Sequence, residues 1–272
     1  MEKQWWLKPL PLQHITLQTR IIMEVNHESF TNRDVPYPAS FLAAGNIDSS
    51  SLERWKDAIH TVHKEEKSIF LQLEAEGDEF HTASRNTALH DIHHMIQIYA
   101  DKAAKAEQAG FDGVEIPGTK GSVIHSFVSR KSNERTGNWG GSLNDRLHFP
   151  LAVARHVREY TRSDFPLFFR LPSVTDTDAA EELAMMARQL EASGVDLFHI
   201  GSETDNRSTK TSLQNILHTA SSVKNTVSVP VIISTGTTEA VTSTQLKEKN
   251  PFDGISVHEG NESWKRLFLS ET

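Results

Sequence analysis

The chain has 272 residues, 37% of them hydrophobic, so it can bury a large core in one barrel-sized domain or two smaller ones. Its formal net charge of −8 disfavours nucleic-acid binding, because phosphate contacts need clustered Lys and Arg side chains. The lack of cysteine excludes disulfides and thiolate metal sites. Because we also find no signal peptide and no uninterrupted apolar run of about 18 residues, we expect a soluble cytoplasmic protein that does not bind a membrane.

Two helices and several strands are predicted along the chain. The first helix follows a capping box at 50–53 and extends to Val62, with apolar residues at helical spacing. The second follows a capping box at 178–181 and extends to Leu190. Short apolar runs bounded by charge or proline predict buried parallel strands. These runs are 68–73, 167–171 and 231–233.

A weak internal repeat indicates the architecture. Three segments enter a short apolar strand through an aspartate: AGFDGVEI at 109–116, SGVDLFHI at 193–200 and NPFDGISV at 250–257. Glycine can end the preceding helix in the left-handed conformation, and aspartate suits the turn before the strand. Alternating helices and strands predict an α/β fold, either a (β/α)8 barrel or a doubly wound sheet. Because no linker or low-complexity tract is visible, we expect residues 1–272 to form a single domain.

The segment 109–146 helps to decide between a (β/α)8 barrel and a doubly wound sheet. Its strand segment AGFDGVEI is followed by a long polar loop with the pattern N-x-R-x-x-x-x-GGS-x-x-x-R, from Asn133 to Arg146. Both parts resemble the old yellow enzyme family of FMN-dependent reductases. The resemblance covers nearly the whole chain at varying strength, and it implies a (β/α)8 barrel. Between Met23 and Leu52 the chain is shorter than the family pattern, so we expect a reduced or irregular first βα unit with only a stub of the second strand at 41–44.

The resemblance also implies a cofactor site. Gln72 and Arg170 match residues that contact the pyrimidine edge of the FMN ring, where a fixed positive charge would stabilise the reduced flavin. Thr235 and Gly236, with His258, occupy the region that binds the FMN phosphate. Glu259 stands where the family has an arginine, and it would repel that phosphate. We therefore expect FMN to be bound weakly or lost, with NADH or NADPH as the reductant.

The substrate side departs further from the family pattern. Pro117 and Lys120 replace the paired His or Asn side chains that bind an unsaturated carbonyl, and Ser122 replaces a proton-donating tyrosine. Lys120 and Ser122 are therefore the candidate catalytic residues, acting on a small-molecule acceptor. Two functions remain open. The chain is either an FMN-dependent oxidoreductase with an altered acceptor, or a catalytically degenerate, weakly flavin-binding or flavin-free relative that binds a ligand or partner. The sequence does not indicate the oligomeric state.

A histidine cluster gives a weaker signal. His90, His93 and His94 stand at the start of a helix, and two or three of them could share one helical face. They lack a convincing third ligand of the right kind for a metal. We therefore predict a solvated or capping cluster and no metal site.

Overall fold

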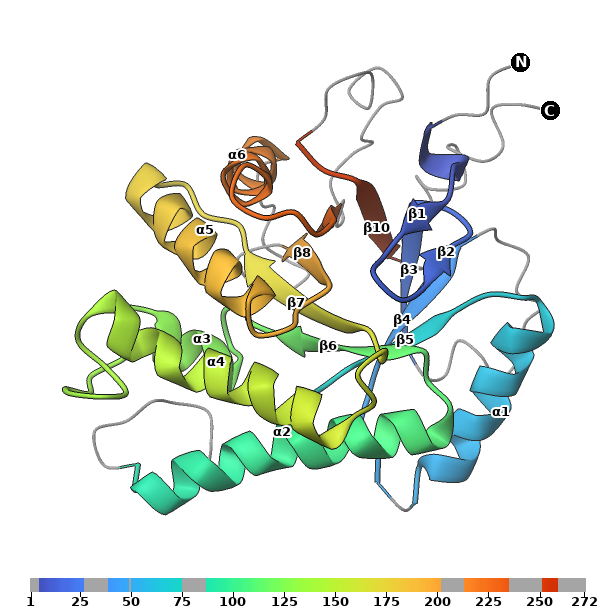
Figure 1. Ribbon diagram of the computed structural model, residues 1–272, viewed down its shortest axis with the longest axis horizontal. Helices are drawn as coiled ribbons and strands as arrows, with labels where there is room; N and C mark the ends of the chain where they lie inside the picture. The colour runs from blue at the N-terminus through green and yellow to red at the C-terminus, as the bar shows by residue number, and fades with distance from the viewer. Residues whose placement is uncertain are drawn as a thin grey trace.

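Eight parallel strands close into a barrel in the order β10-β3-β4-β5-β6-β7-β8-β9 (Figure 1). The computed structural model describes residues 5–26, 39–48, 50–74, 87–201, 213–234 and 251–258. This closed parallel sheet confirms the predicted (β/α)8 class. The strands are β3 (Ile21–Asn26), β4 (Ser40–Ala44), β5 (Ile69–Gln72), β6 (Gly113–Pro117), β7 (Leu167–Pro172), β8 (Leu197–Gly201), β9 (Val231–Ser234) and β10 (Gly254–His258).

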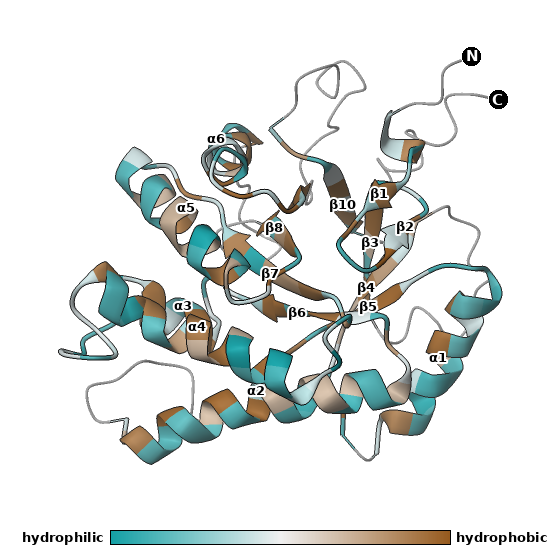
Figure 2. Cartoon of the chain, viewed as in Figure 1, coloured by the Kyte–Doolittle hydropathy of each residue, from teal (hydrophilic) through white to brown (hydrophobic). Residues whose placement is uncertain are grey.

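Six described helices accompany the barrel. Each has a buried apolar face, as at Trp55, Ile59 and Val62 of the first, and polar residues elsewhere. Figure 2 shows the same division: the strands are mainly hydrophobic, whereas the helices mix hydrophobic and hydrophilic residues. Among the described residues, no helix is long and apolar enough to cross a membrane. The helices are α1 (Leu52–Lys64), α2 (Leu89–Ala109), α3 (Val123–Val128), α4 (Leu143–Tyr160), α5 (Thr177–Glu191) and α6 (Leu213–Lys224).

The second barrel strand is complete rather than a stub. β4 pairs along five residues with β3 and along four with β5. Four of its five residues are buried. The connection before it, 27–38, lies outside the described residues, as does any first helix there. The shortening of the sequence in this region therefore leaves the strand itself intact.

The aspartates of the internal repeat join neighbouring strands. Asp112, Asp196 and Asp253 each accept a hydrogen bond of 2.8 Å from the first backbone N–H of the neighbouring strand β5, β7 or β9. Gly110 and Gly194 end their helical segments with φ of 101° and 98°, the left-handed conformation that glycine adopts readily. The repeat is therefore a structural device that fixes strand pairing at the amino end of the barrel.

Both helix starts differ from the predicted capping boxes. The N-cap residue of α1 is Ser51, whose side chain does not cap the helix. Instead Asp48 accepts from the Ser50 and Ser51 backbone N–H groups, and its hydrogen bond with the Ser50 side chain contributes most to lowering the pKa of Asp48 to about 2. The N-cap of α5 is Asp176, which accepts from the backbone N–H of Asp178. At both helix starts, an aspartate near the predicted capping box therefore accepts the backbone hydrogen bonds.

A hairpin contributes to the lower interior of the barrel. β1 (Leu10–Pro11) and β2 (Thr16–Leu17) pair antiparallel after a short helix, η1 (Trp5–Leu7). Two hairpin leucines join side chains from six barrel strands in one apolar cluster, which fills the interior. Because side chains alternate along a strand, the residues two positions further on lie above this cluster, towards the carboxyl ends of the strands. The cluster consists of Leu10, Leu17, Ile22, Leu42, Phe70, Phe168, Leu197 and Ile232.

Candidate functional site at the carboxyl end of the barrel

A layer of polar side chains lies above the apolar interior, and we call it the polar layer. In five strands its residue comes two positions after a member of the apolar cluster, for example Arg170 after Phe168 and His199 after Leu197. In barrels of this class, side chains at the carboxyl ends of the strands form the active site. The polar layer consists of Glu24, Gln72, Glu115, Arg170, His199, Ser234 and Ser256.

Arg170 holds two carboxylates together in this layer. Its Nη1 atom lies 3.1 Å from Oε2 of Glu24 and 3.9 Å from Oε1 of Glu115, and the residue is buried. Gly201, at the end of β8, leaves the space for its guanidinium. A Cβ atom at Gly201 would lie 2.6 Å from Nε of Arg170. The fold therefore fixes this cation at one position beside the carboxyl end of the barrel.

Glu24 is ionised despite being largely buried. Burial by itself raises the pKa of its carboxyl group, but the charges of Arg170 and His199 lower it. Hydrogen bonds from Ser256 and Arg170 lower it further, so the pKa of Glu24 is well below its usual range. The hydroxyl groups of Ser256 and Ser234 donate to Oε1 of Glu24 at 2.5 Å and 3.2 Å. Glu24 is therefore a fixed negative charge next to Arg170.

His199 links the second carboxylate to this pair. Its Nδ1 atom lies 2.8 Å from Oε2 of Glu115, and its Nε2 atom lies 2.8 Å from Oγ of Ser256. Because the single hydroxyl hydrogen of Ser256 goes to Glu24, Nε2 of His199 must donate to Ser256. The remaining contact then requires one proton between His199 and Glu115. With that proton, the guanidinium and the shared proton balance the two carboxylates, and the polar layer is neutral.

The order Ser256, His199, Glu115 resembles that of a hydrolase triad, but it cannot work as one. In a triad the serine gives its hydrogen to the histidine and attacks a substrate. Here Ser256 gives its hydrogen to Glu24, and both Ser256 and His199 have no solvent-exposed surface. The network therefore positions charges and protons inside the barrel and does not supply a nucleophile.

The structure brings together two of the predicted cofactor residues. Nε2 of Gln72 donates to Oε1 of Glu115 at 2.8 Å, and Glu115 also faces Arg170. His258 is the half-buried last residue of β10, in register with Glu24. Thr235 and Gly236 lie outside the described residues.

The two predicted catalytic residues lie at the rim, after β6. Ser122 is the N-cap residue of α3, and its Oγ atom accepts from the backbone N–H of His125 at 3.0 Å. Lys120 is exposed, two residues before this cap. Pro117 is the buried last residue of β6, in register with Arg170. Of these positions, Ser122 has a clear structural role as a helix cap, and Lys120 has the freedom to face a ligand.

Sequence reasoning missed five members of the polar layer: Glu24, Glu115, His199, Ser234 and Ser256. A signal was present, since each stands in a strand that is mostly apolar. A polar residue in a strand that is buried on both faces needs a partner, and here the partners come from other strands.

The loop that carries the family resemblance is held by its own side chains. The amide of Asn133 donates to the carbonyl groups of Phe127 and Trp139, at 2.6 Å and 2.7 Å, and accepts from the backbone N–H of Arg135. The buried Arg146 donates to the carbonyl group of Val128 and pairs with Glu182. The described members of this motif therefore stabilise the loop and do not join the polar layer.

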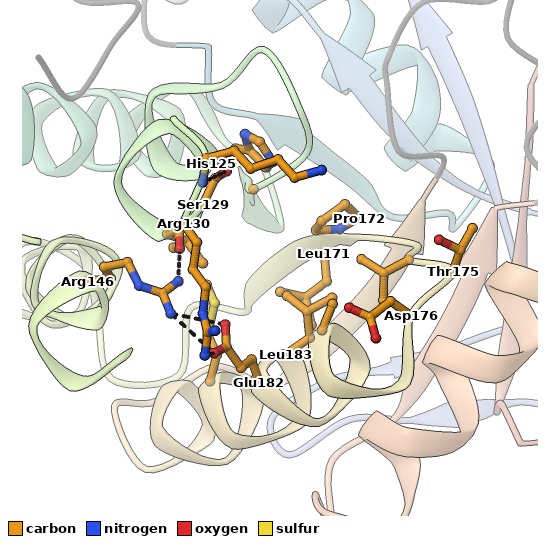
Figure 3. A pocket seen from close by; sticks show the side chains of 16 residues that line it. His125, Ser129, Arg130, Arg146, Leu171, Pro172, Thr175, Asp176, Glu182 and Leu183 are labelled. Carbon is orange, nitrogen blue, oxygen red and sulfur yellow. Dashed lines mark hydrogen bonds and ion pairs between the residues drawn. The ribbon is translucent and has the colours of Figure 1, made fainter. Parts of the chain in front are cut away.

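A cavity of about 320 Å³ lies between this loop and α5 (Figure 3). Arg130 and Arg146 both turn to Glu182, whose single carboxylate balances one of their two charges within the wall. Leu171 and Pro172 follow Arg170 on β7 and form part of the lining, but no residue of the polar layer does. The cavity is therefore distinct from the polar layer, although β7 connects the two.

The histidine cluster and the described parts of the chain show no metal site. His90, His93 and His94 are exposed in the first turns of α2. Within the described ranges, no group of three or more His, Asp and Glu side chains is arranged to hold a metal ion.

Comparison with solved structures supports the fold. The chain superimposes on morphinone reductase in complex with tetrahydroNAD with a TM-score of 0.75 and 18% identity, covering 98% of this chain and 91% of that one. A 2-naphthoyl-CoA reductase complex gives a TM-score of 0.78 and 18% identity, covering 98% of this chain and 52% of that one. At this level of identity, the likeness establishes the barrel alone.

Sequence comparisons identify the family. The NADH oxidase of Thermoanaerobacter brockii is 34% identical over 122 residues, which are 44% of this chain and 19% of the relative. A probable NADH-dependent flavin oxidoreductase of Bacillus subtilis is 39% identical over 85 residues, 30% of this chain and 23% of the relative. The matched parts thus span about a fifth of these relatives. The model of the NADH:flavin oxidoreductase / NADH oxidase family matches residues 84–258. The chain therefore belongs to this family of flavin-dependent oxidoreductases.

Proposed function

We propose that this chain is an FMN-dependent oxidoreductase that uses NADH or NADPH to reduce a small acceptor. The observation that carries the proposal is the convergence of Gln72 and Arg170 at the carboxyl end of the barrel, within one hydrogen-bonded network. Both positions match the ring-contacting residues of the old yellow enzymes. FMN, when bound there, would supply the hydride-transfer chemistry.

The described donors, Gln72 and Arg170, are of the chemical types that can bind a flavin ring. A carboxamide can both donate to and accept from the pyrimidine edge of the ring, and a guanidinium can donate to its N1 and O2 atoms. Gly201 provides the space that lets the guanidinium lie across the end of β8. The permanent charge of Arg170 would favour the anionic reduced ring over the oxidised one. Thr235, Gly236 and His258 are the proposed contacts of the phosphate group.

The proposed acceptor site lacks the two neutral side-chain donors with which old yellow enzymes bind an unsaturated carbonyl. Pro117 has no side-chain donor, and Ser122 is engaged as the cap of α3. Lys120, exposed at the same rim, is therefore the proposed donor to an acceptor oxygen. A compact ammonium on a flexible stem suits an anionic or strongly polar acceptor better than a simple enone. We accordingly expect cyclohexenone to be reduced slowly or not at all.

A titration of the purified protein with FMN tests the proposal. We expect weak binding, seen as a shifted visible flavin spectrum and as a gain in thermal stability. Arg170→Ala should weaken FMN binding by about tenfold or more, since hydrogen bonds to charged groups contribute about 1.5–3 kcal/mol. Arg162→Ala is the matched control, because that arginine is 68% exposed and pairs with Glu107 outside the polar layer. If saturating FMN produces neither signal, the proposed function is wrong.

The second candidate is a relative that has lost productive flavin chemistry and binds another ligand or a partner. Two features favour it: Glu24 already occupies one edge of Arg170, and Glu259 replaces an arginine in the phosphate region. The same titration separates the candidates, because a protein of this kind would show no flavin spectrum and no stabilisation by FMN.

A further inference from the structure

We propose that Glu24 is an internal counterion that competes with the flavin for Arg170 and so weakens the binding of FMN, above all in its reduced form. This inference rests on the proposed function. It assigns a specificity-determining role to a residue that contacts the guanidinium and that sequence reasoning did not select.

The geometry of the ion pair limits what Arg170 can offer a ligand. Nη1 of Arg170 donates to Oε2 of Glu24 at 3.1 Å, so one edge of the guanidinium is already occupied by an acceptor. Oε1 of the same carboxylate receives the Ser256 and Ser234 hydroxyl groups. Three donors from three strands therefore hold Glu24 in place. A ligand that approaches Arg170 must share the guanidinium with this carboxylate.

The charges of the polar layer are already balanced. Arg170 and one shared proton balance Glu24 and Glu115, so the layer is neutral without a ligand. An oxidised flavin ring adds no net charge, whereas a reduced flavin anion adds one that nothing in the described layer offsets. In a site shielded from water, an uncompensated charge is costly. Glu24 should therefore disfavour reduced flavin more than oxidised flavin.

The barrel fixes the position of Glu24. β3 pairs with β10 on one side and β4 on the other, which fixes Glu24 in register with His258 and within hydrogen-bond distance of Ser256. The carboxylate is 15% exposed, and among the described residues its ion-pair partners are Arg170 and His199. Both of these also face Glu115. The layer thus has no spare positive charge to give to a ligand.

Glu24→Gln is the direct test, because the amide keeps the shape of the side chain and removes its charge. FMN should bind the variant about tenfold more tightly than it binds wild type. The affinity ratio of reduced to oxidised flavin should rise by a further factor of about ten, which corresponds to about 30 mV in a two-electron reduction potential. Both quantities come from spectroscopic titrations of the full chain with FMN and with dithionite-reduced FMN.

Two controls isolate the role of Arg170. Glu182→Gln removes a carboxylate from another buried arginine, Arg146, and should leave both flavin affinities unchanged. In an Arg170→Gln background, Glu24→Gln should no longer tighten the binding of oxidised FMN, because Glu24 then has no guanidinium for which to compete; the double-mutant cycle measures this coupling. If Glu24→Gln does not fold, Glu24→Asp replaces it. The shorter side chain draws the carboxylate away from Arg170, so the same shifts are expected with smaller size.

The outcomes separate this inference from the proposed function. If wild type and the Glu24 variant both fail to bind FMN at saturation, the flavin function itself falls, and the counterion role falls with it. If wild type binds FMN but the variant binds it no more tightly and with an unchanged ratio of reduced to oxidised affinity, the counterion role is wrong while the flavin function stands. Tighter binding in the Arg170→Gln background as well would also overturn the role assigned to Arg170.

Discussion

At the scale of single residues, the polar layer depends on Arg170 and Glu24 in different ways. Arg170 is the only permanent cation in the layer, and it faces both carboxylates. Glu24 is held by hydroxyl groups as well as by the guanidinium. A buried ion pair of this kind is weak evidence for added stability, because desolvation offsets much of the attraction. Breaking it from one side is nevertheless destabilising, since the remaining charge loses its partner.

Because the pKa of Glu24 is low, we expect its contribution to the stability of the fold to depend on pH. Its folded-state pKa lies below the ordinary value of 4.5, so the ionised form contributes stability above that pH. As the pH falls below about 4.5, the unfolded chain binds a proton that the folded chain does not, and this contribution is lost. Glu24→Gln cannot titrate. We expect the variant to be less stable than wild type by about 2 kcal/mol at pH 7, with a difference that shrinks as the pH is lowered from 5 to 3.

Urea denaturation of the flavin-free protein at pH 3, 4, 5 and 7 measures this difference. Glu53→Gln is a suitable control, because Glu53 is 80% exposed in an i,i+3 pair with Lys56. That substitution should change stability by less than about 0.5 kcal/mol at every pH. A constant gap between wild type and Glu24→Gln across the range would show that the charge of Glu24 is not what stabilises the barrel.

At the scale of elements, the loop between α3 and α4 is the part of the chain that most resembles the old yellow enzymes, yet its role here is architectural. The Asn133 side chain ties the end of α3 to the turn at Trp139, and Arg135 reaches the carbonyl group of Thr87. The packing of Phe127 on Phe149, with ring centroids 4.1 Å apart, joins α3 to α4 beneath it. The motif thus builds a support beside the barrel and does not join the polar layer.

We therefore predict that Asn133→Ala destabilises the fold and leaves intrinsic flavin binding unchanged. Removing the amide leaves one buried carbonyl group, one partly buried carbonyl group and one N–H without this partner, which should cost about 2–3 kcal/mol. Chemical denaturation measures the loss, and limited proteolysis should show faster cleavage between α3 and α4. Asn138→Ala, at an exposed position of the same loop, should leave both unchanged. A change in FMN affinity of tenfold or more at full folding would assign the loop to the site.

The elements themselves were largely predictable, because their signals are local. The repeated aspartate turns and the apolar runs identify strands β6, β8 and β10 from short segments of sequence. Exact helix starts were not, since Ser50, Ser51 and Asp48 compete for the same backbone groups at α1. The extent of β4 was harder to predict. Its apolar run is short and lies between long polar stretches, yet it pairs with a strand on each edge and forms a full strand.

The site was predictable only in part, for a physical reason. Gln72 and Arg170 could be proposed because each matches a family position by itself. Glu24 and Arg170 are 146 positions apart in the chain, and Glu24 and Ser256 are 232 positions apart, so their contacts exist only after the barrel closes. No local pattern encodes that a carboxylate on the first strand of the barrel faces an arginine on the fifth. A buried charge in an apolar strand was the available clue.

At the scale of the whole molecule, barrel closure places the first and last barrel strands next to each other. β10 pairs with β3, and His258 lies in register with Glu24. β9 and β10 are also neighbours, so Ser234 and His258 end adjacent strands at the same end of the barrel. The segments that continue from these two residues carry the proposed phosphate contacts. The topology is therefore consistent with a phosphate site that both segments share, although Thr235, Gly236 and Glu259 lie outside the described residues.

The sign of the charge at position 259 gives the last prediction. If Glu259 faces the FMN phosphate, Glu259→Arg removes a repulsion and adds a charge-assisted hydrogen bond, each on the order of 1 kcal/mol or more. Together these should tighten FMN binding by roughly tenfold to a hundredfold, since about 1.4 kcal/mol corresponds to one decade. Riboflavin has the same ring without the phosphate, so its dissociation constant should change much less. Glu24→Gln should by contrast tighten both ligands equally, because it acts on the ring. Equal changes for FMN and riboflavin in Glu259→Arg, or none for either, would place Glu259 away from the phosphate.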